Sequence, residues 1–371
     1  MSVDNKNLLK YFVVGLIIFS TIFFLRGVIE EGEDKRVARS KVGDDFSTAK
    51  KELPEKIYLD SKGDINPRFF LEETKTKGLI VVRGNEIIHE SYYLGKDEET
   101  KFNLKSGTSS FLTLIMGLAV EDGKVDLNKP VSYYITDLKG SVYDNILVKH
   151  VLELTTGTRF PSDLDVNFVD RSLESDRSYD YFLKPFKSAK IESDPGSYID
   201  PFEPTPGVLL GFILQESTDY NLSEYVEKNL WNPLGATDDF KWKMLNRERE
   251  VPFSFFYATL RDWEKIGRLM LFEGGDLISE DWIKKITKPQ EKEIVEVNDY
   301  YENFYYGLQW LVPRNRKGGE FMSVVGSGGR YIYVNPDKNI VIIKMGEDHD
   351  YTTNYPLNID FLRSLADYYS L

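Results

Sequence analysis

A serine hydroxyl at the start of an apolar helix is the group in this sequence best placed to do chemistry. Ser106 lies in the stretch KSGTSSF (residues 105–111), which leads into the apolar run 112–120. The run predicts a buried helix, whose N-terminus favours negative charge developing on a nucleophilic oxygen. A serine nucleophile also needs a base. One helical turn later stands Ser109, a hydroxyl that is no base at neutral pH, and Lys105 projects about 100° away around a regular helix. Ser106 could also be only a helix N-cap.

Composition excludes several classes of function. Of the 371 residues 41% are hydrophobic and 29% charged, an ordinary globular balance. The net charge of -13 leaves no basic surplus for phosphates, so we expect no nucleic-acid partner. The absence of cysteine rules out disulfides and thiol nucleophiles. The three histidines are far apart in the sequence, and we expect neither a metal site nor a cofactor.

An apolar segment near the N-terminus predicts a membrane anchor. Residues 11–25 are uncharged, and snorkelling of Lys10 and Arg26 extends the plausible span to residues 8–29, enough for the about 20 residues that a bilayer needs. No small-residue cleavage site follows, which favours a signal anchor over a cleaved signal peptide. We therefore expect an anchor over 1–29, a tether and irregular lead-in over 30–75, and one domain over 76–371.

The orientation of this anchor has two readings. Lysines and arginines are more numerous on its C-terminal side, which alone would place the domain in the cytoplasm. The family resemblance described below favours the opposite orientation. We expect a membrane-anchored domain that faces the periplasm or the cell exterior.

Strand-like runs stand at both ends of the domain. Residues 78–82 and 87–94 predict one hairpin across a Gly-Asn turn, and 330–334 with 340–344 predict a second. Between them the apolar periodicity is helical, over 106–121, 209–214, 222–230 and 262–272. The prediction is an α+β fold, with one antiparallel sheet flanked by helices and a large helical insertion.

Several sequence blocks in a fixed order extend this prediction. They are GLAVEDGKVDLNKP (117–130), VLELTTG (151–157), WNPLGA (231–236), ATLRDW (258–263), YGLQW (306–310) and the stretch 329–344. Together they resemble the β-lactamase-related serine hydrolases, most closely the branch that includes 6-aminohexanoate-dimer hydrolase, over about residues 78–346. The resemblance implies the β-lactamase/transpeptidase fold.

The same resemblance assigns roles to particular positions. Ser106 matches the nucleophile of a Ser-x-x-Lys motif whose lysine position holds Ser109. Counting back from the Leu-Leu-Gly helix places Phe202 at the position of the family tyrosine, with Tyr198 as a possible substitute if the loop is shifted. The third family motif lies on the strand that borders the site, and in this sequence its position is taken by the glycine-rich stretch Gly326, Ser327, Gly328 and Gly329.

The resemblance also implies an oxyanion hole. Its donors would be the backbone N–H groups of Ser106 and of a residue near Gly329, which survive any change of side chain. Asp200 and Glu203 are acidic groups near the expected pocket. We interpret them as solvated loop residues, with a replacement base as the less favoured alternative.

Three functions fit these observations. The first is a membrane-tethered homologue that has lost the usual chemistry and binds a peptide, an amide, a cell-wall fragment or a protein partner. The second is an active hydrolase of esters or amides with Ser106 as nucleophile and a non-standard base. The third is a structural envelope protein. We favour the first because the lysine and the tyrosine are both replaced.

Overall fold

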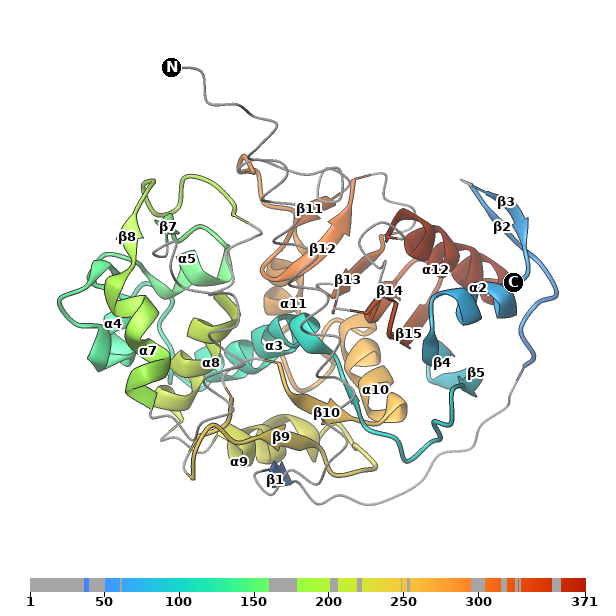
Figure 1. Ribbon diagram of the computed structural model, residues 1–371, viewed down its shortest axis with the longest axis horizontal. Helices are drawn as coiled ribbons and strands as arrows, with labels where there is room; N and C mark the ends of the chain where they lie inside the picture. Colours follow the sequence, from blue (N-terminus) through green and yellow to red (C-terminus); the bar gives the residue numbers. More distant parts are fainter. Residues whose placement is uncertain are drawn as a thin grey trace.

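The computed structural model describes most of the chain beyond residue 50 (Figure 1). The described residues are 37–39, 51–60, 62–159, 179–200, 206–218, 222–247, 249–251, 254–294, 304–314, 319–323, 326, 328–348 and 355–371. Among them no helix is long and apolar enough to cross a membrane. The predicted anchor over 1–29 lies outside these residues.

A seven-stranded antiparallel sheet joins the two ends of the domain. Its order is β11-β12-β13-β14-β15-β4-β5, so that β15 pairs with β4, with Val341 opposite Val82. The two predicted hairpins are confirmed as β4–β5 and β14–β15. The strands are β4 (Thr76–Arg83), β5 (Glu86–Tyr92), β11 (Phe304–Tyr306), β12 (Trp310–Pro313), β13 (Phe321–Ser323), β14 (Tyr331–Asn335) and β15 (Ile340–Gly346).

Both faces of this sheet are covered, which explains the continuous apolar runs of its central strands. Val341 and Ile343 face the larger core, on the side of helix α10 (Leu260–Leu271). Ile340 and Ile342 face the second core, which helix α12 (Tyr355–Ser370) covers together with α2 (Pro67–Glu73). Figure 1 shows the C-terminal helix lying along the sheet.

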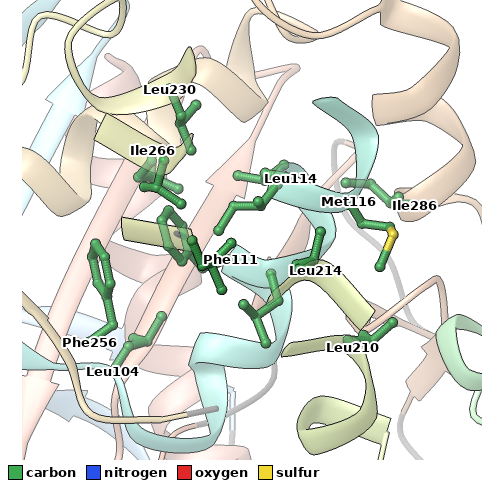
Figure 2. Packing of buried hydrophobic residues seen from close by; sticks show 14 of the residues in the cluster. Leu104, Phe111, Leu114, Met116, Leu210, Leu214, Leu230, Phe256, Ile266 and Ile286 are labelled. Carbon is green, nitrogen blue, oxygen red and sulfur yellow. The ribbon is translucent and has the colours of Figure 1, made fainter. Parts of the chain in front are cut away.

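Helix α3 (Thr108–Glu121) passes through the middle of the molecule, as its apolar sequence predicts (Figure 1). It packs against α8 and α11, and Phe111 contacts Phe256 at 4.5 Å between ring centroids. Figure 2 shows Phe111, Leu114 and Met116 within this core. A Cβ on Gly117 would lie 2.5 Å from the Trp282 ring, so the absence of a side chain permits this close approach. The helix ends with Asp122 as C-cap and Gly123 at φ +69°, a conformation that glycine adopts readily.

A helical lobe occupies the insertion between the two halves of the sheet. Its elements are α4 (Val131–Tyr134), α5 (Val148–Leu152), β7 (Thr158–Arg159), α7 (Tyr179–Ser188), β8 (Lys190–Ile191), α8 (Pro206–Ser217), α9 (Leu222–Val226), the π-helical turn Glu227–Trp231 and α11 (Glu280–Thr287). The predicted α+β architecture with a large helical insertion is therefore confirmed.

Two expectations about organisation were wrong in part. The chain forms a second sheet, β1-β9-β10-β6, from β1 (Val37–Arg39), β6 (Phe102–Asn103), β9 (Lys241–Lys243) and β10 (Phe256–Ala258). The lead-in is also not irregular throughout, because β2 (Ile57–Leu59), β3 (Gly63–Ile65) and α2 lie within it. Strands of two or three residues are too short for a periodic pattern to show.

Candidate functional site

Ser106 lies in a short 3₁₀ turn, Lys105–Gly107, that leads into α3. Its side chain is exposed, whereas Gly107 and Thr108 after it are buried. Lys105 before it has a left-handed backbone with φ +56°, and its N–H donates to Asn103 Oδ1 at 2.7 Å. Strained backbone conformations of this kind persist only where the surrounding structure holds them, and they cluster at functional sites.

The conformation of Lys105 corrects a premise of the sequence interpretation. A residue with positive φ does not continue a regular helix, so the angle of about 100° between Lys105 and Ser106 does not apply. The Lys105 ammonium lies 5.7 Å from the centroid of the Phe255 ring, in a different part of the sequence. Ser109 is half-buried in the first turn of α3, three residues after Ser106.

Buried hydrogen bonds fix the first turns of α3 in place. Ser110 Oγ donates to the carbonyl of Gln309 at 2.6 Å, and Trp310 Nε1 donates to Thr113 Oγ1 at 3.0 Å. Gln309 itself has a left-handed backbone, and its Nε2 donates to the carbonyl of Leu152 at 3.3 Å. The helix that presents Ser106 is thus held by β12 and, through Gln309, by α5.

The glycine turn of the third motif packs directly on the segment before Ser106. A Cβ on Gly326 would lie 2.0 Å from the carbonyl oxygen of Leu104, a contact that only glycine allows. Arg330 closes the turn, because its Nη1 donates to the carbonyl of Asn103 and its Nε to that of Gly346 at 3.1 Å. The structure therefore brings the first and third predicted motifs together.

Two further glycines of the third motif lie in the turn that Arg330 closes. Gly328 and Gly329 have left-handed backbones there, with φ +90° and +72°. Ser327 lies outside the described residues. The oxyanion-hole role near Gly329 stays a prediction.

The second predicted motif is described only in part. Phe202 and Glu203 lie outside the described residues. Tyr198 is 44% exposed on a loop whose backbone is held at Ile199, where the N–H donates to the carbonyl of Glu293 at 2.8 Å. The N–H of Asp200 donates to the carbonyl of Leu154, also at 2.8 Å. These contacts join the loop to the α5 side of the lobe, and the assignment of Tyr198 as a substitute stays a prediction.

Two lysines near these motifs escaped the sequence interpretation. Lys243 of β9 places its ammonium 5.2 Å from the Phe255 ring centroid, on the ring that Lys105 also approaches. Lys344 of β15 is fully buried, and a Cβ on Gly329 would lie 3.7 Å from its Nζ. Burial lowers the pKa of Lys344 to about 7, against the opposing effect of the Asp348 carboxylate. The one signal for Lys344 was a charge at the end of an apolar strand run, whereas only the fold reveals Lys243.

No metal centre is found in the part of the chain that the structure describes, since no group of three or more His, Asp or Glu side chains is placed to hold an ion there.

An antiparallel sheet beside a helical lobe, with a serine before a buried central helix and a glycine turn packed against it, defines the β-lactamase-related class of serine hydrolase folds. The Beta-lactamase family matches residues 71–363 of this chain. The chain belongs to that family.

Its relatives include proteins of different activities. The 6-aminohexanoate-dimer hydrolase of Paenarthrobacter ureafaciens is 25% identical over 307 residues, or 77% of this chain and 76% of the relative. A solved Bacillus anthracis structure described as a 6-aminohexanoate-dimer hydrolase has a TM-score of 0.76 at 20% identity, covering 90% of both chains. A penicillin-binding protein of Bacillus halodurans has a TM-score of 0.62 at 16% identity, covering 81% of this chain and 99% of its own. The two structures show the shared fold.

Proposed function

We propose that this Beta-lactamase-family chain binds a peptide, an amide or a cell-wall fragment at the Ser106 site without hydrolysing it. The observation that most supports the proposal is Ser109, which occupies the turn after Ser106 where the family places a lysine. A hydroxyl there cannot take the Ser106 proton at neutral pH, so Ser106 is not activated by it. Nucleophilic attack would need another base.

Binding a ligand, by contrast, does not require a base. It requires only that the backbone around Ser106, here called the frame of the site, is held in place. The support for a retained frame is the strained Lys105, the hydrogen bonds of Ser110 and Thr113, and the Gly326 turn against Leu104. A frame held this closely favours a pocket that still recognises a ligand over a purely structural protein. The name of the Paenarthrobacter relative points to a short linear amide as the class of ligand.

A second candidate is an active hydrolase of esters or amides with a non-standard base. It is favoured by the amine of Lys105, the residue directly before Ser106, whose Nζ lies over the same Phe255 ring as that of Lys243. A neutral amine can serve as a base. Covalent labelling of Ser106 by a fluorophosphonate separates the candidates: the binding function predicts no adduct, whereas an active hydrolase forms one that Ser106→Ala abolishes.

We also propose that residues 8–29 anchor the domain in a membrane, with the domain facing the periplasm or the cell exterior. The support is the uncharged run 11–25 with Lys10 and Arg26 at its ends. The full chain should remain with membranes after alkaline carbonate washing, while a chain lacking residues 1–29 should be released. Release of both would contradict the anchor, and protease protection of the domain in intact spheroplasts, whose outer barrier has been removed, would contradict the outward orientation.

A further inference from the structure

Asn103 makes two different contacts just before Ser106. It ends β6 and is buried, with 4% of its surface exposed. Its side-chain Oδ1 accepts from the Lys105 N–H at 2.7 Å, and its backbone carbonyl accepts from Arg330 Nη1. An amide nitrogen cannot accept from an N–H, which fixes the orientation of the side-chain amide. The Nδ2 atom is buried without a hydrogen-bond partner among the described residues, so the side chain acts here through its oxygen.

This oxygen supports the unusual backbone of Lys105. With φ +56°, Lys105 lies in the left-handed region, which residues with a side chain rarely adopt. An asparagine oxygen that accepts from the N–H two residues further on stabilises a turn at that point. The backbone angles of Lys105 set the direction in which the chain continues. The bond from Asn103 therefore also sets where Ser106 stands relative to the first turn of α3.

Arg330 ties the same segment to the glycine turn of the third motif. Its Nη1 donates to the Asn103 carbonyl, its Nε to the Gly346 carbonyl at 3.1 Å, and its backbone N–H to the Gly326 carbonyl at 3.2 Å. One residue thereby connects the end of β6, the end of β15 and the turn. A planar guanidinium holds two acceptors in fixed directions, which an ammonium group on a flexible stem does not.

We infer that Asn103 and Arg330 are positioning residues for Ser106. Asn103 acts through the backbone of Lys105, and Arg330 acts by holding Asn103 against the glycine turn. The inference rests on the proposed function in one respect, because it takes Ser106 as the residue that meets the ligand. It applies to a site that binds and to a site that hydrolyses.

A thiol in place of the Ser106 hydroxyl reports this positioning without any ligand. The chain has no cysteine, so Ser106→Cys introduces a single thiol. The rate of its alkylation by iodoacetamide, measured from pH 6 to 9.5, gives both its reactivity and its pKa. A helix N-terminus lowers the pKa of a thiol below the ordinary value of about 8.5. We expect a lowered pKa in Ser106→Cys, because residue 106 lies in the turn that leads into α3.

Substitutions of Asn103 in the Ser106→Cys background test its role. Asn103→Leu removes the acceptor without changing the charge. It should raise the thiol pKa toward the ordinary value and lower the alkylation rate at pH 7 about three- to tenfold. Asn103→Ser supplies a hydroxyl that makes the same contact more weakly, so its thiol pKa and rate should lie between those of Asn103 and Asn103→Leu.

The matched control is Asn335→Leu in the same background. Asn335 is also buried, and its Oδ1 also accepts from a backbone N–H, that of Lys338 at 3.2 Å. It stands at the end of β14 opposite to Arg330. Asn335→Leu should lower the Tm, because a buried hydrogen bond is lost, and should leave the thiol pKa and the alkylation rate unchanged.

Arg330→Lys tests the second residue, because it keeps the positive charge and loses the fixed directions of the guanidinium. It should raise the thiol pKa in the same direction as Asn103→Leu does. Combined with Asn103→Leu it should add less than its own separate effect, since the two residues act on one segment. An unchanged thiol pKa and rate in Arg330→Lys would overturn the role of Arg330.

Three results would overturn the role of Asn103. They are an ordinary thiol pKa in Ser106→Cys itself, unchanged values in a folded Asn103→Leu, and an equal change in Asn335→Leu. If Asn103→Leu does not fold, unchanged values in Asn103→Ser and Arg330→Lys together overturn the inference. No ligand enters these measurements, so their failure leaves the proposed binding function intact, and failure of that function leaves the thiol results standing.

Discussion

Ser109→Lys combined with Phe202→Tyr is expected to give the chain ester turnover at least about 10²-fold above its own background, since a positioned general base contributes about 10²–10⁴-fold. The lysine would stand three residues after Ser106, in the first turn of α3, and the half-buried position of Ser109 favours its neutral form. The measurement is hydrolysis of p-nitrophenyl butyrate.

The control for this repair is Ser106→Ala in the repaired chain, which should return turnover to background. The single variants separate the effects of the lysine amine and the tyrosine hydroxyl on ester turnover. We expect Ser109→Lys to raise turnover more than Phe202→Tyr. A repaired chain with no turnover, or turnover that persists without Ser106, would contradict the assignment of these positions.

Lys344→Met is expected to stabilise the domain by roughly 4 kcal/mol at pH 7. The folded-state pKa of Lys344 is about 7, below the ordinary lysine value of 10.5, because the side chain is fully buried in β15. Between pH 7 and 10.5 the unfolded chain therefore binds more protons at this residue than the folded chain does. The destabilising effect of Lys344 is complete below pH 7 and fades as the pH rises toward 10.5.

The increase in the free energy of unfolding that Lys344→Met produces should accordingly fall to about 1 kcal/mol at pH 9.5. Urea denaturation at the two pH values measures it, with Lys190→Met on the exposed strand β8 as the matched control. A gain that does not depend on pH, or a net loss of stability in Lys344→Met, would contradict this account of the buried lysine.

Long apolar patterns made much of the fold predictable. The hairpins β4–β5 and β14–β15 and the helix α3 follow from runs of several apolar residues bounded by turn residues, and the structure confirms them. The sheet that includes β6, β9 and β10 could not be foreseen, because its strands have only two or three residues and β6 at Phe102–Asn103 pairs with the distant β10 at Phe256–Ala258. Local patterns contain no information about such pairs.

The candidate site was likewise predictable from the sequence only in part. The placement of Ser106 at the start of α3 and of Ser109 in its first turn could be predicted from the apolar run that follows, whereas the 3₁₀ turn that contains Ser106 could not. The left-handed backbone of Lys105 could not be predicted, since a residue with a side chain adopts it only where tertiary contacts hold it. The approach of Lys243 to the Phe255 ring likewise depends on the pairing of β9 with β10.

Covalent labelling tests the central claim most directly. The full chain is treated with an alkyl fluorophosphonate at pH 8, where an activated serine reacts, and its intact mass is followed alongside that of Ser106→Ala. We predict that the chain gains no phosphonyl group and that its mass matches its untreated form, as the mass of Ser106→Ala does. A stoichiometric adduct on the native chain that is absent from Ser106→Ala would show that Ser106 is an active nucleophile and would contradict the proposed loss of chemistry.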